Sequence, residues 1–182
     1  MIRLIQHTDA ERIWSLVELN RKYLRKWLPW LDGNISINDT RKFITDSLTG
    51  YEQKTSMVHV IIDNQVCGIC GFNSFNPSIN AGFIGCWISE EYQGKGLVTE
   101  ACRALEDIGF GPLGLNKIEI HVADGNIPSR KVAERLGYVE TGSILDAEWL
   151  YDHYVDHVIY CKRNPANNKL HRTPANSAGA TR

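Results

Sequence analysis

The sequence of 182 residues predicts a single domain of the mixed α/β class. Segments with apolar residues at helical spacing are interleaved with segments in which apolar and polar residues alternate, as they do in strands. The chain is long enough for one domain with a full hydrophobic core. With 43% apolar and 23% charged residues, its composition is that of an ordinary globular protein.

The first part of the chain predicts a strand followed by two helices. IRLIQ alternates like a strand, and Thr8 or Asp9 can cap the helix that follows. That helix should end before Pro29, and a second should run from near Asn38 or Asp39 to about Gly50. The expected apolar stripes are Ile13, Leu16, Val17 and Leu19 in the first helix, and Phe43, Ile44 and Leu48 in the second.

The periodicity then changes to that of a three-stranded meander. SMVHVIID and VCGICGFNSF read as two strands joined by a tight turn at residues 63–65, and NAGFIGCWIS reads as the third. The next segment, VTEACRALEDIGF, is an amphipathic helix. Its apolar stripe consists of Val98, Ala101, Cys102, Leu105 and Ile108.

The last part of the domain predicts a strand, a short helix and two strands. KIEIHVADG has Ile118, Ile120 and Val122 on one face. Asn126 can cap the short helix, with Pro128 in its first turn and Gly137 after its end. YVETGSI and HYVDHVIYCKR follow as strands, so the expected order is β-α-α-β-β-β-α-β-α-β-β. The remaining segment, 164–182, is polar and aperiodic, and we expect a tail there.

Charge and cysteine content limit the possible partners. The net charge of −1 gives no overall attraction to nucleic acid or to an anionic membrane. We expect a cytoplasmic protein, because no apolar run approaches a membrane span and the first residues lack the apolar core of a signal peptide. The five cysteines suggest free thiols. Cys67 and Cys70 should point to opposite faces of a strand, which favours buried structural thiols and no metal site.

A glycine-rich turn between a strand and a helix indicates a phosphate site. In YQGKGLVTE, Gly94 and Gly96 can adopt positive φ and leave main-chain N–H groups free beside the positive end of the helix dipole, while Lys95 adds a cation. A nucleoside-triphosphate loop would need Lys-Ser/Thr after the last glycine, which this sequence lacks. The dinucleotide fingerprint fails at its third glycine, where Thr99 stands.

The remaining pattern, Gln93-x-x-Gly96-x-Val98, resembles the Q/R-x-x-G-x-G/A loop with which GNAT N-acetyltransferases bind the pyrophosphate of coenzyme A. Val98 departs from the Gly/Ala of that motif. Further blocks follow in the order of the RimJ/RimL branch, the ribosomal-protein N-terminal acetyltransferases, over residues 1–163. They are LRKWLPWLD, GFIGCWIS, the N-x-x-S…G-[YF] pattern from Asn126 to Tyr138, and AEWLYDHYVDHVIY.

The resemblance implies one GNAT-like domain over residues 1–163, with a mostly antiparallel, twisted sheet that splays between strands 4 and 5 and is flanked by helices. The pantetheine arm of acetyl-CoA would lie in that gap, and a main-chain N–H near Trp87 or Ile88 would bind the thioester carbonyl. The cofactor-binding residues it implies are Trp87, Ile88, Ser89, Gln93, Gly94, Lys95, Gly96, Leu97, Val98, Thr99, Asn126 and Ser129.

The same resemblance suggests catalytic roles. Ser129 would protonate the departing thiolate, although it could simply be an early-helix serine. Glu148, in the A-E-[WY] block, would be the base if Trp149 and Leu150 partly desolvate it, or else an exposed glutamate at a strand start. Apart from the resemblance, His121 lies on the strand opposite the cofactor gap and could act through water instead, or it could be a structural or solvated histidine. Trp27 and Trp30 either line an acceptor groove or fix a helix corner.

These residues predict an acetyl-CoA-dependent N-acetyltransferase that acts by direct attack in a ternary complex. The acceptor would be a primary amine, either a protein N-terminus or a small molecule. A non-catalytic acyl-CoA-binding sensor or scaffold is the alternative. The resemblance also implies a homodimer or higher homo-oligomer.

Overall fold

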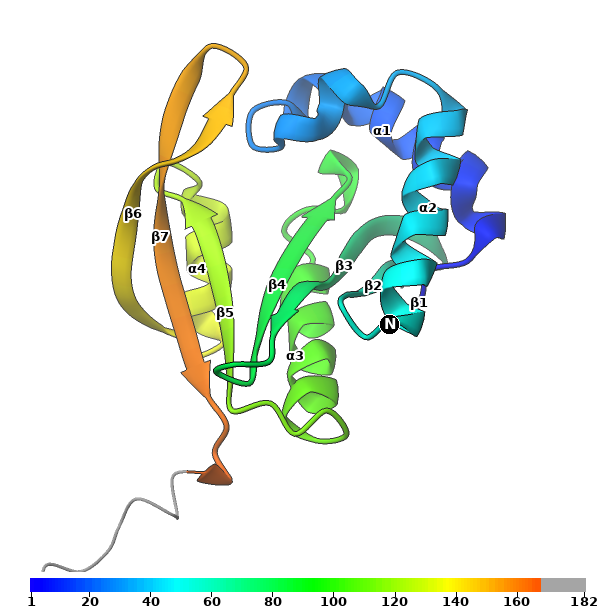
Figure 1. Ribbon diagram of the computed structural model, residues 1–182. Coiled ribbons are helices and arrows are strands. Elements are labelled where there is room, and N and C mark those ends of the chain that lie inside the picture. Colours follow the sequence, from blue (N-terminus) through cyan, green and yellow to red (C-terminus); the bar gives the residue numbers. More distant parts are fainter. Residues whose placement is uncertain (168–182) are drawn as a thin grey trace, which may run out of the picture.

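The computed structural model describes residues 1–167 and contains one seven-stranded sheet in the order β1-β2-β3-β4-β5-β7-β6 (Figure 1). Residues 168–182, most of the expected tail, lie outside the described residues. The strands are β1 (Ile2–Leu4), β2 (Met57–Asp63), β3 (Gln65–Asn76), β4 (Ala81–Ile88), β5 (Lys117–Ala123), β6 (Val139–Leu150) and β7 (His153–Arg163). The helices are α1 (Ala10–Leu24), α2 (Ile37–Glu52), α3 (Leu97–Phe110) and α4 (Ile127–Arg135), with 3₁₀ turns η1 (His7–Asp9), η2 (Pro29–Gly33) and η3 (Glu90–Tyr92).

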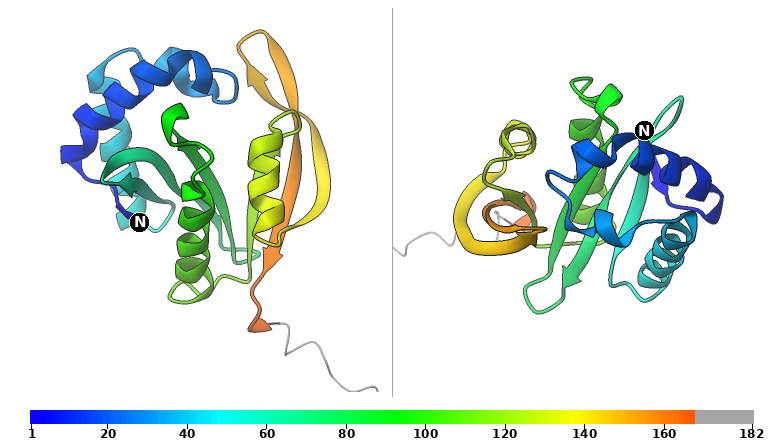
Figure 2. Two further views of the ribbon diagram at one scale, coloured as in Figure 1. Left: turned by 180° about the vertical axis from the view of Figure 1, so that it is seen from behind. Right: turned by 90° about the horizontal axis from the view of Figure 1, so that it is seen from above.

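Helices cover both faces of the sheet. The helices α1 and α2 pack on β2 and β3 through a cluster that includes Leu16, Ile44 and Val60. On the opposite face, α3 and α4 lie side by side (Figure 2) and cover a second cluster that includes Leu105 and Ile118. The stripes predicted for residues 98–110 and for KIEIHVADG both belong to this second cluster, which confirms those predictions.

The sheet splits between β4 and β5. These strands form the parallel pair of the sheet, and only three residue pairs join them, from Ala81↔Lys117 to Phe83↔Glu119. The other neighbouring strands are antiparallel. Beyond Phe83 the two strands diverge, and the gap widens toward the top of Figure 1. The predicted element order, the mixed α/β class and the splay between strands 4 and 5 are therefore confirmed.

Polar contacts reinforce the end of the molecule where the two halves of the sheet meet. Lys162 of β7 donates to Glu106 of α3 and to the Leu136 carbonyl, both at 2.8 Å. Asn164 is buried, and its side chain donates to the carbonyls of Phe110 (3.2 Å) and Leu115 (2.9 Å). The folded part of the chain therefore continues past Arg163, where we had expected the tail to begin.

Two expectations for the first helix were wrong. Asp9 precedes α1, but its carboxylate accepts from Arg3 and from the Gln6 N–H (2.9 Å), so it ties η1 to β1 and does not cap α1. Leu19 is 77% exposed. The inward position next to it belongs to Asn20, which continues the stripe of Leu16 and Val17 at helical spacing.

Two elements are longer than expected. The helix α2 begins at Ile37, because the Asp39 carboxylate accepts from the Ser36 N–H (2.8 Å) just before it, and it continues past Gly50 to Glu52. The strand β6 does not stop at Ile144. An irregularity between Ile144 and Glu148, where Asp146 has φ +49°, lets the strand resume and pair Glu148 with Val155 of β7.

The prediction that Cys67 and Cys70 point to opposite faces was wrong. Consecutive residues Ile61 and Ile62 of β2 pair with Gly68 and Val66, which leaves Cys67 as the extra residue of a β-bulge. The bulge changes the alternation, so both side chains reach the core cluster under α3. Both are buried free thiols, as predicted.

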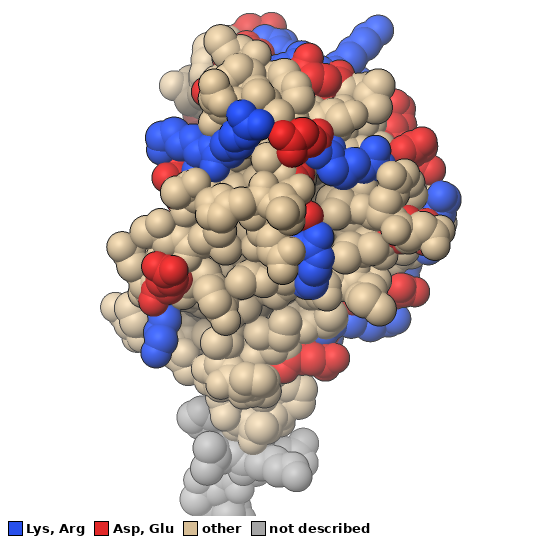
Figure 3. Space-filling view, turned by 90° about the vertical axis from the view of Figure 1, so that its right-hand side faces the viewer, with Lys and Arg blue, Asp and Glu red and all other residues tan. Residues whose placement is uncertain are grey.

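The surface matches the nearly balanced charge of the sequence. On the side of the molecule where α2 lies, acidic and basic side chains are interspersed (Figure 3). None of the helices within residues 1–167 has the length and apolar character needed to span a membrane.

Candidate functional site

The glycine-rich turn leads directly into α3. Gly94 (φ +73°) and Gly96 (φ +80°) are left-handed, and Gly96 is the N-terminal cap of the helix. Among the described residues, no acceptor bonds the main-chain N–H groups of residues 94–99, whereas the N–H of Glu100 already bonds within the helix, to the Gly96 carbonyl at 3.0 Å. These N–H groups and the positive end of α3 have the arrangement that the predicted anion site requires.

Asn20 of α1 holds the chain just before this turn. Its amide is 7% exposed, donates to the Leu16 carbonyl (2.8 Å) and the Ser89 hydroxyl (3.1 Å), and accepts from the Glu90 N–H (2.9 Å). This residue was not predicted from the sequence. The available signal was an amide at an inward position of an apolar stripe, where a polar side chain needs a partner.

The side chains of Gln93 and Lys95 are held by the protein itself. Gln93 donates to the Tyr23 hydroxyl, and burial together with the charge of Glu90 raises the pKa of Tyr23. The Lys95 side chain does not point toward the N–H groups of the turn. Its ammonium lies 4.5 Å above the Tyr92 ring and 4.0 Å from Asp63, so it faces the β2–β3 turn.

The hydrogen-bond pattern of β4 distinguishes the main-chain groups predicted to bind the cofactor. The Ser89 N–H donates to the Cys67 carbonyl of β3 at 2.9 Å, and the Ser89 carbonyl accepts from Tyr92 at 3.0 Å. The Ser89 main-chain groups thus each have a partner within the protein, and the role of Ser89 in cofactor binding stays a prediction. Because bonding alternates along an antiparallel ladder, Trp87 also faces β3, whereas Ile88 faces the gap. Of the two donors considered, the geometry favours Ile88.

The opposite wall of the gap is the start of α4. The Asn126 side-chain oxygen caps the helix by accepting from the Ser129 N–H at 3.3 Å, as the helix signals predicted. The Ser129 hydroxyl makes no hydrogen bond within residues 1–167, and both side chains line the cleft. The Ser129 hydroxyl is therefore available to a ligand.

Three cations that the sequence analysis did not single out line the same part of the cleft. They are Arg103 on α3 and Lys131 and Arg135 on α4. Arg135 also donates to the Thr99 hydroxyl at 3.1 Å, which joins the first turn of α3 to α4. Leu97 and Val98 pack against the core in that turn, so the bulkier Val98 is accommodated there. The unbonded N–H groups and these cations fit a ligand with several phosphates, such as coenzyme A.

On the other face of the sheet, aromatic side chains line the cleft. The ring centroids of Trp30 and Trp87 are 6.5 Å apart, and the side chains of Phe83 and Phe43 line the same cleft. Ring atoms of Trp27 lie 3.8 Å from the position of a Cβ on Gly125, so Trp27 reaches the loop before α4. The predicted tryptophans therefore border the cleft.

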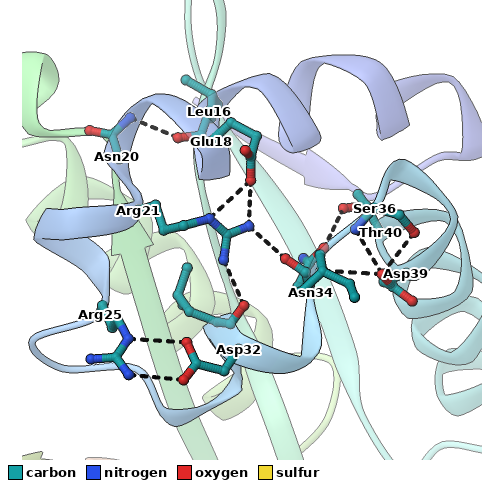
Figure 4. A network of polar contacts seen from close by, with 12 residues as sticks. Leu16, Glu18, Asn20, Arg21, Arg25, Asp32, Asn34, Ser36, Asp39 and Thr40 are labelled. Carbon is teal, nitrogen blue, oxygen red and sulfur yellow. Dashed lines mark hydrogen bonds and ion pairs between the residues drawn. The ribbon is translucent and has the colours of Figure 1, made fainter.

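The corner that carries these tryptophans is fixed by Arg21 of α1 and by Arg25, the residue that caps the end of this helix (Figure 4). Arg21 donates to the carbonyls of Leu31 (2.7 Å) and Asn34 (2.6 Å). Arg25 forms two bonds to Asp32, at 3.0 and 2.9 Å. The guanidinium of Arg25 also lies 3.6 Å above the Tyr151 ring, and Tyr151 donates to the Leu28 carbonyl. The β6–β7 turn is thereby joined to the α1–η2 corner across the top of the split sheet.

The predicted base lies on this face with a partner that the sequence analysis missed. The Glu148 carboxylate on β6 is 3.6 Å from His157 Nε2 on β7, and both side chains are partly exposed to the cleft. His121 of β5 lines it as well. One continuous cleft of about 1570 Å³ thus contains the glycine-rich turn, Ser129, Glu148 and His121.

Comparison with known proteins agrees with this arrangement. Residues 1–139 match the family model described as "Acetyltransferase (GNAT) domain". A relative from Bacillus subtilis (strain 168), named "Putative ribosomal N-acetyltransferase YdaF", is 34% identical over 161 residues, 87% of this chain and 88% of the relative. The ribosomal-protein-serine acetyltransferase of Escherichia coli (strain K12) is 25% identical over 162 residues, 88% of this chain and 90% of that protein.

A solved structure shows the same fold. RimL, a ribosomal L7/L12 alpha-N-protein acetyltransferase in complex with coenzyme A, matches with a TM-score of 0.85 at 24% identity, over 89% of this chain and 92% of that chain. The matches favour an enzyme over the non-catalytic acyl-CoA-binding module that the sequence left open. The chain belongs to the GNAT acetyltransferase family and is an acetyl-CoA-dependent N-acetyltransferase of the RimJ/RimL type.

Proposed function

We propose that the protein acetylates the α-amino group of a protein N-terminus, with Glu148 as the base and Ser129 as the proton donor to the departing thiol. The observation that carries the proposal is the single cleft that joins both residues to the glycine-rich turn across the split sheet. The names of the relatives support the acceptor class, because they include ribosomal-protein acetyltransferases.

Acetyl-CoA supplies an acetyl group activated as a thioester. The N–H groups of residues 94–99 would hold its diphosphate, and Arg103, Lys131 and Arg135 would balance the phosphate charge. The gap-facing main chain of Ile88 would bind the pantetheine arm as a neighbouring strand does. The chain therefore offers a partner for each polar part of this co-substrate.

The acceptor side provides the proton transfers. An α-amino group has a pKa of about 8, so much of it is protonated near neutral pH and must lose a proton before it can attack. The amine that attacks loses a further proton as the carbon–nitrogen bond forms, and the Glu148 carboxylate, beside His157, can take a proton from the acceptor nitrogen. On the cofactor side, the unbonded Ser129 hydroxyl can donate its proton to the thiol that leaves.

The covered top of the cleft supports a chain end as the acceptor. The Tyr151 hydroxyl donates to the Leu28 carbonyl, and the Trp27 ring lies against Gly125. These contacts join the two halves of the sheet above the acceptor side of the cleft. An extended N-terminus can enter such an opening end-on and place its amine at Glu148.

An acceptor screen tests the proposal. Peptides with free N-termini, the same peptides with blocked N-termini and an internal lysine, and a polyamine are offered with acetyl-CoA while thiol release is recorded. We expect turnover with free N-termini, and mass spectrometry should place the acetyl group on the α-nitrogen. Turnover confined to the polyamine, or to blocked peptides, would overturn the acceptor class.

The role of Glu148 is tested by Glu148→Gln. Removal of a general base lowers kcat by roughly 10²–10⁴-fold. The KM for acetyl-CoA should stay close to that of the wild type, because the cofactor-side contacts are untouched. The control is Glu52→Gln at the exposed end of α2, which should leave both constants unchanged. Equal kcat values for Glu148→Gln and the wild type would remove Glu148 from the mechanism.

A further inference from the structure

Three polar side chains alternate along β5 on the acceptor face. Ile118, Ile120 and Val122 point into the core under α3 and α4, so Lys117, Glu119 and His121 point to the other face. Glu119 Oε2 lies 3.0 Å from His121 Nε2, and Lys117 donates to the other oxygen of the same carboxylate. Glu119 therefore links an imidazole to an ammonium group.

Glu119 is itself poorly suited to accept a proton. Its side chain is only 13% exposed, and burial alone would raise its pKa, but the hydrogen bonds from Lys117 and His121 outweigh burial and lower that pKa. An ionised carboxylate only accepts hydrogen bonds, so His121 Nε2 carries the hydrogen between them. The neutral imidazole then has its lone pair on Nδ1. Glu119 thus fixes which nitrogen of His121 can take a proton.

The position of His121 places it at the point where the sheet opens. The last β4–β5 residue pair is Phe83↔Glu119, and His121 is the next residue of β5 on the same face. The centroids of its ring and the Phe83 ring are 5.6 Å apart, and the two rings are nearly perpendicular. On β7, Ile159 lies directly opposite His121. His157, two residues before Ile159, lies opposite Ala123. The charged or titratable groups around it are therefore Glu119 and Lys117 on β5, Cys161 and His157 on β7, and Glu148 on β6 beyond His157.

Acetylation of an ammonium acceptor requires the nitrogen to lose two protons. The bond from nitrogen to the acetyl carbon forms and the carbon–sulfur bond breaks. One proton ends on sulfur as the thiol, and the other is released to solvent. Glu148 can hold one proton at a time, so a second acceptor in the same cleft allows both to leave without waiting for Glu148 to discharge.

We propose that His121, positioned by Glu119, is this second proton acceptor. It takes the proton that converts the ammonium acceptor into the free amine, and Glu148 takes the proton released as the carbon–nitrogen bond forms. The inference rests on the proposed role of Glu148 and adds a second proton acceptor, one positioned by a neighbouring carboxylate. Glu119 is a positioning residue, since it acts only through the imidazole.

The pH dependence of kcat/KM for the acceptor tests the proposal. We expect His121→Asn to lower kcat/KM about tenfold or more near neutral pH, where much of the α-amine is protonated. The deficit should close above about pH 9, where the α-amine is already free. Glu119→Gln should give a smaller deficit that closes over the same pH range. The KM for acetyl-CoA should not change in either variant.

The control is His153→Asn in the β6–β7 turn, where the side chain is 61% exposed and bonds Asp152. It should follow the wild type at every pH. A deficit of the same factor at all pH values in His121→Asn or Glu119→Gln would show a merely structural role and overturn the proposal, as would no deficit at all.

The outcome can be separated from that of the proposed acceptor class. If the screen finds a small amine instead of an N-terminus, the same pH comparison is made with that amine. A deficit that closes above the pKa of that amine would then still support the role of His121. If the wild type acetylates N-termini but His121→Asn matches it throughout, the inference about His121 fails while the proposed function stands.

Discussion

At the scale of single residues, the two glycines of the glycine-rich turn are required for their backbone conformation. Gly94 and Gly96 both have positive φ, whereas a Cβ at either position would meet nothing within 4 Å. Steric crowding is therefore not the reason that these two positions require glycine. A side chain at either position must adopt the left-handed region, which costs about 1–2 kcal/mol.

Gly96→Ala should lower the Tm by about 2–8 °C, because that strain energy converts to Tm at about 2–4 °C per kcal/mol for a chain of this size. It should also raise the KM for acetyl-CoA, since the first N–H groups of α3 would be displaced. Thermal melts and thiol-release kinetics measure both. Gly33→Ala is the matched control, because Gly33 has open space and no positive φ. Equal effects of the two substitutions would contradict the conformational argument.

Asp9 makes stability depend on acid pH. Burial alone would raise its pKa, but the Arg3 side chain and the Gln6 N–H bond the charged form and lower the pKa overall. The resulting stabilisation is fully present above the unfolded pKa of about 3.9 and is lost as pH falls through the lower folded value. Asp9 therefore favours the folded state at neutral pH.

Asp9→Asn should reduce the free energy of unfolding by about 1–3 kcal/mol at neutral pH, because a hydrogen-bonded, charged contact is lost. The difference from the wild type should shrink as pH falls below about 3.9. Urea denaturation at a series of pH values measures it. Asp46→Asn removes the exposed pair with Lys42 and should cost little. A difference that stays constant down to low pH would rule out the titration of Asp9 as its cause.

At the scale of elements, α1 supports the glycine-rich turn. Asn20 joins this helix to the end of β4, and Tyr23, one turn further on, bonds Gln93. The helix that carries the acceptor-side corner is thus also the helix that holds the start of the phosphate site. A shift of α1 would move both.

Asn20→Ala should destabilise the fold by about 1–3 kcal/mol, since it leaves the Glu90 N–H without its partner. It should also raise the KM for acetyl-CoA more than it lowers kcat. The control is Leu19→Ala on the exposed face of the same helix, which should change stability by less than about 0.5 kcal/mol. If the two variants had the same KM, the turn would not depend on Asn20.

Local patterns predicted the elements but not their partners. Helical spacing identified α3, and the glycine, proline and asparagine signals placed the ends of α4. The bulge at Cys67 and the second half of β6 could not be predicted, because both depend on which residues lie opposite on a neighbouring strand. Asn20 and His157 were not predicted because their partners lie on other elements. Glu119 bonds residues 117 and 121 of its own strand, so the alternation of polar residues in KIEIH was the available signal.

At the scale of the whole molecule, few strand pairings join the two halves of the sheet. Besides three β4–β5 residue pairs, the ion pair between Glu106 and Lys162 connects α3 to β7, with side chains 11% and 26% exposed. Burial and the nearby charge of Glu106 also raise the pKa of Tyr138 in the same region. The splay itself was predicted by family resemblance and not by periodicity, since strand patterns do not show where two strands diverge.

Lys162→Met should destabilise the protein by about 3–5 kcal/mol, because it leaves a mostly buried carboxylate without its partner. The double variant Glu106→Leu with Lys162→Met should recover most of that loss. Denaturant titrations of both variants and the wild type give the comparison. If the double variant were as unstable as the single one, the loss would come from packing and not from an unpaired charge.

The homo-oligomer implied by family resemblance stays a prediction. The outer strand β6 carries exposed Val139, Ile144 and Trp149, and light scattering at several concentrations would give the oligomeric state directly.

The division of the sheet also determines at what point during its synthesis the enzyme can first bind acetyl-CoA. A nascent chain that has emerged only as far as Asn116 contains the glycine-rich turn and α1, but it lacks the wall made by β5, α4 and the last two strands. Thioester capture thus waits for the final third of the polypeptide. Binding of acetyl-CoA would then indicate that the whole domain has been translated.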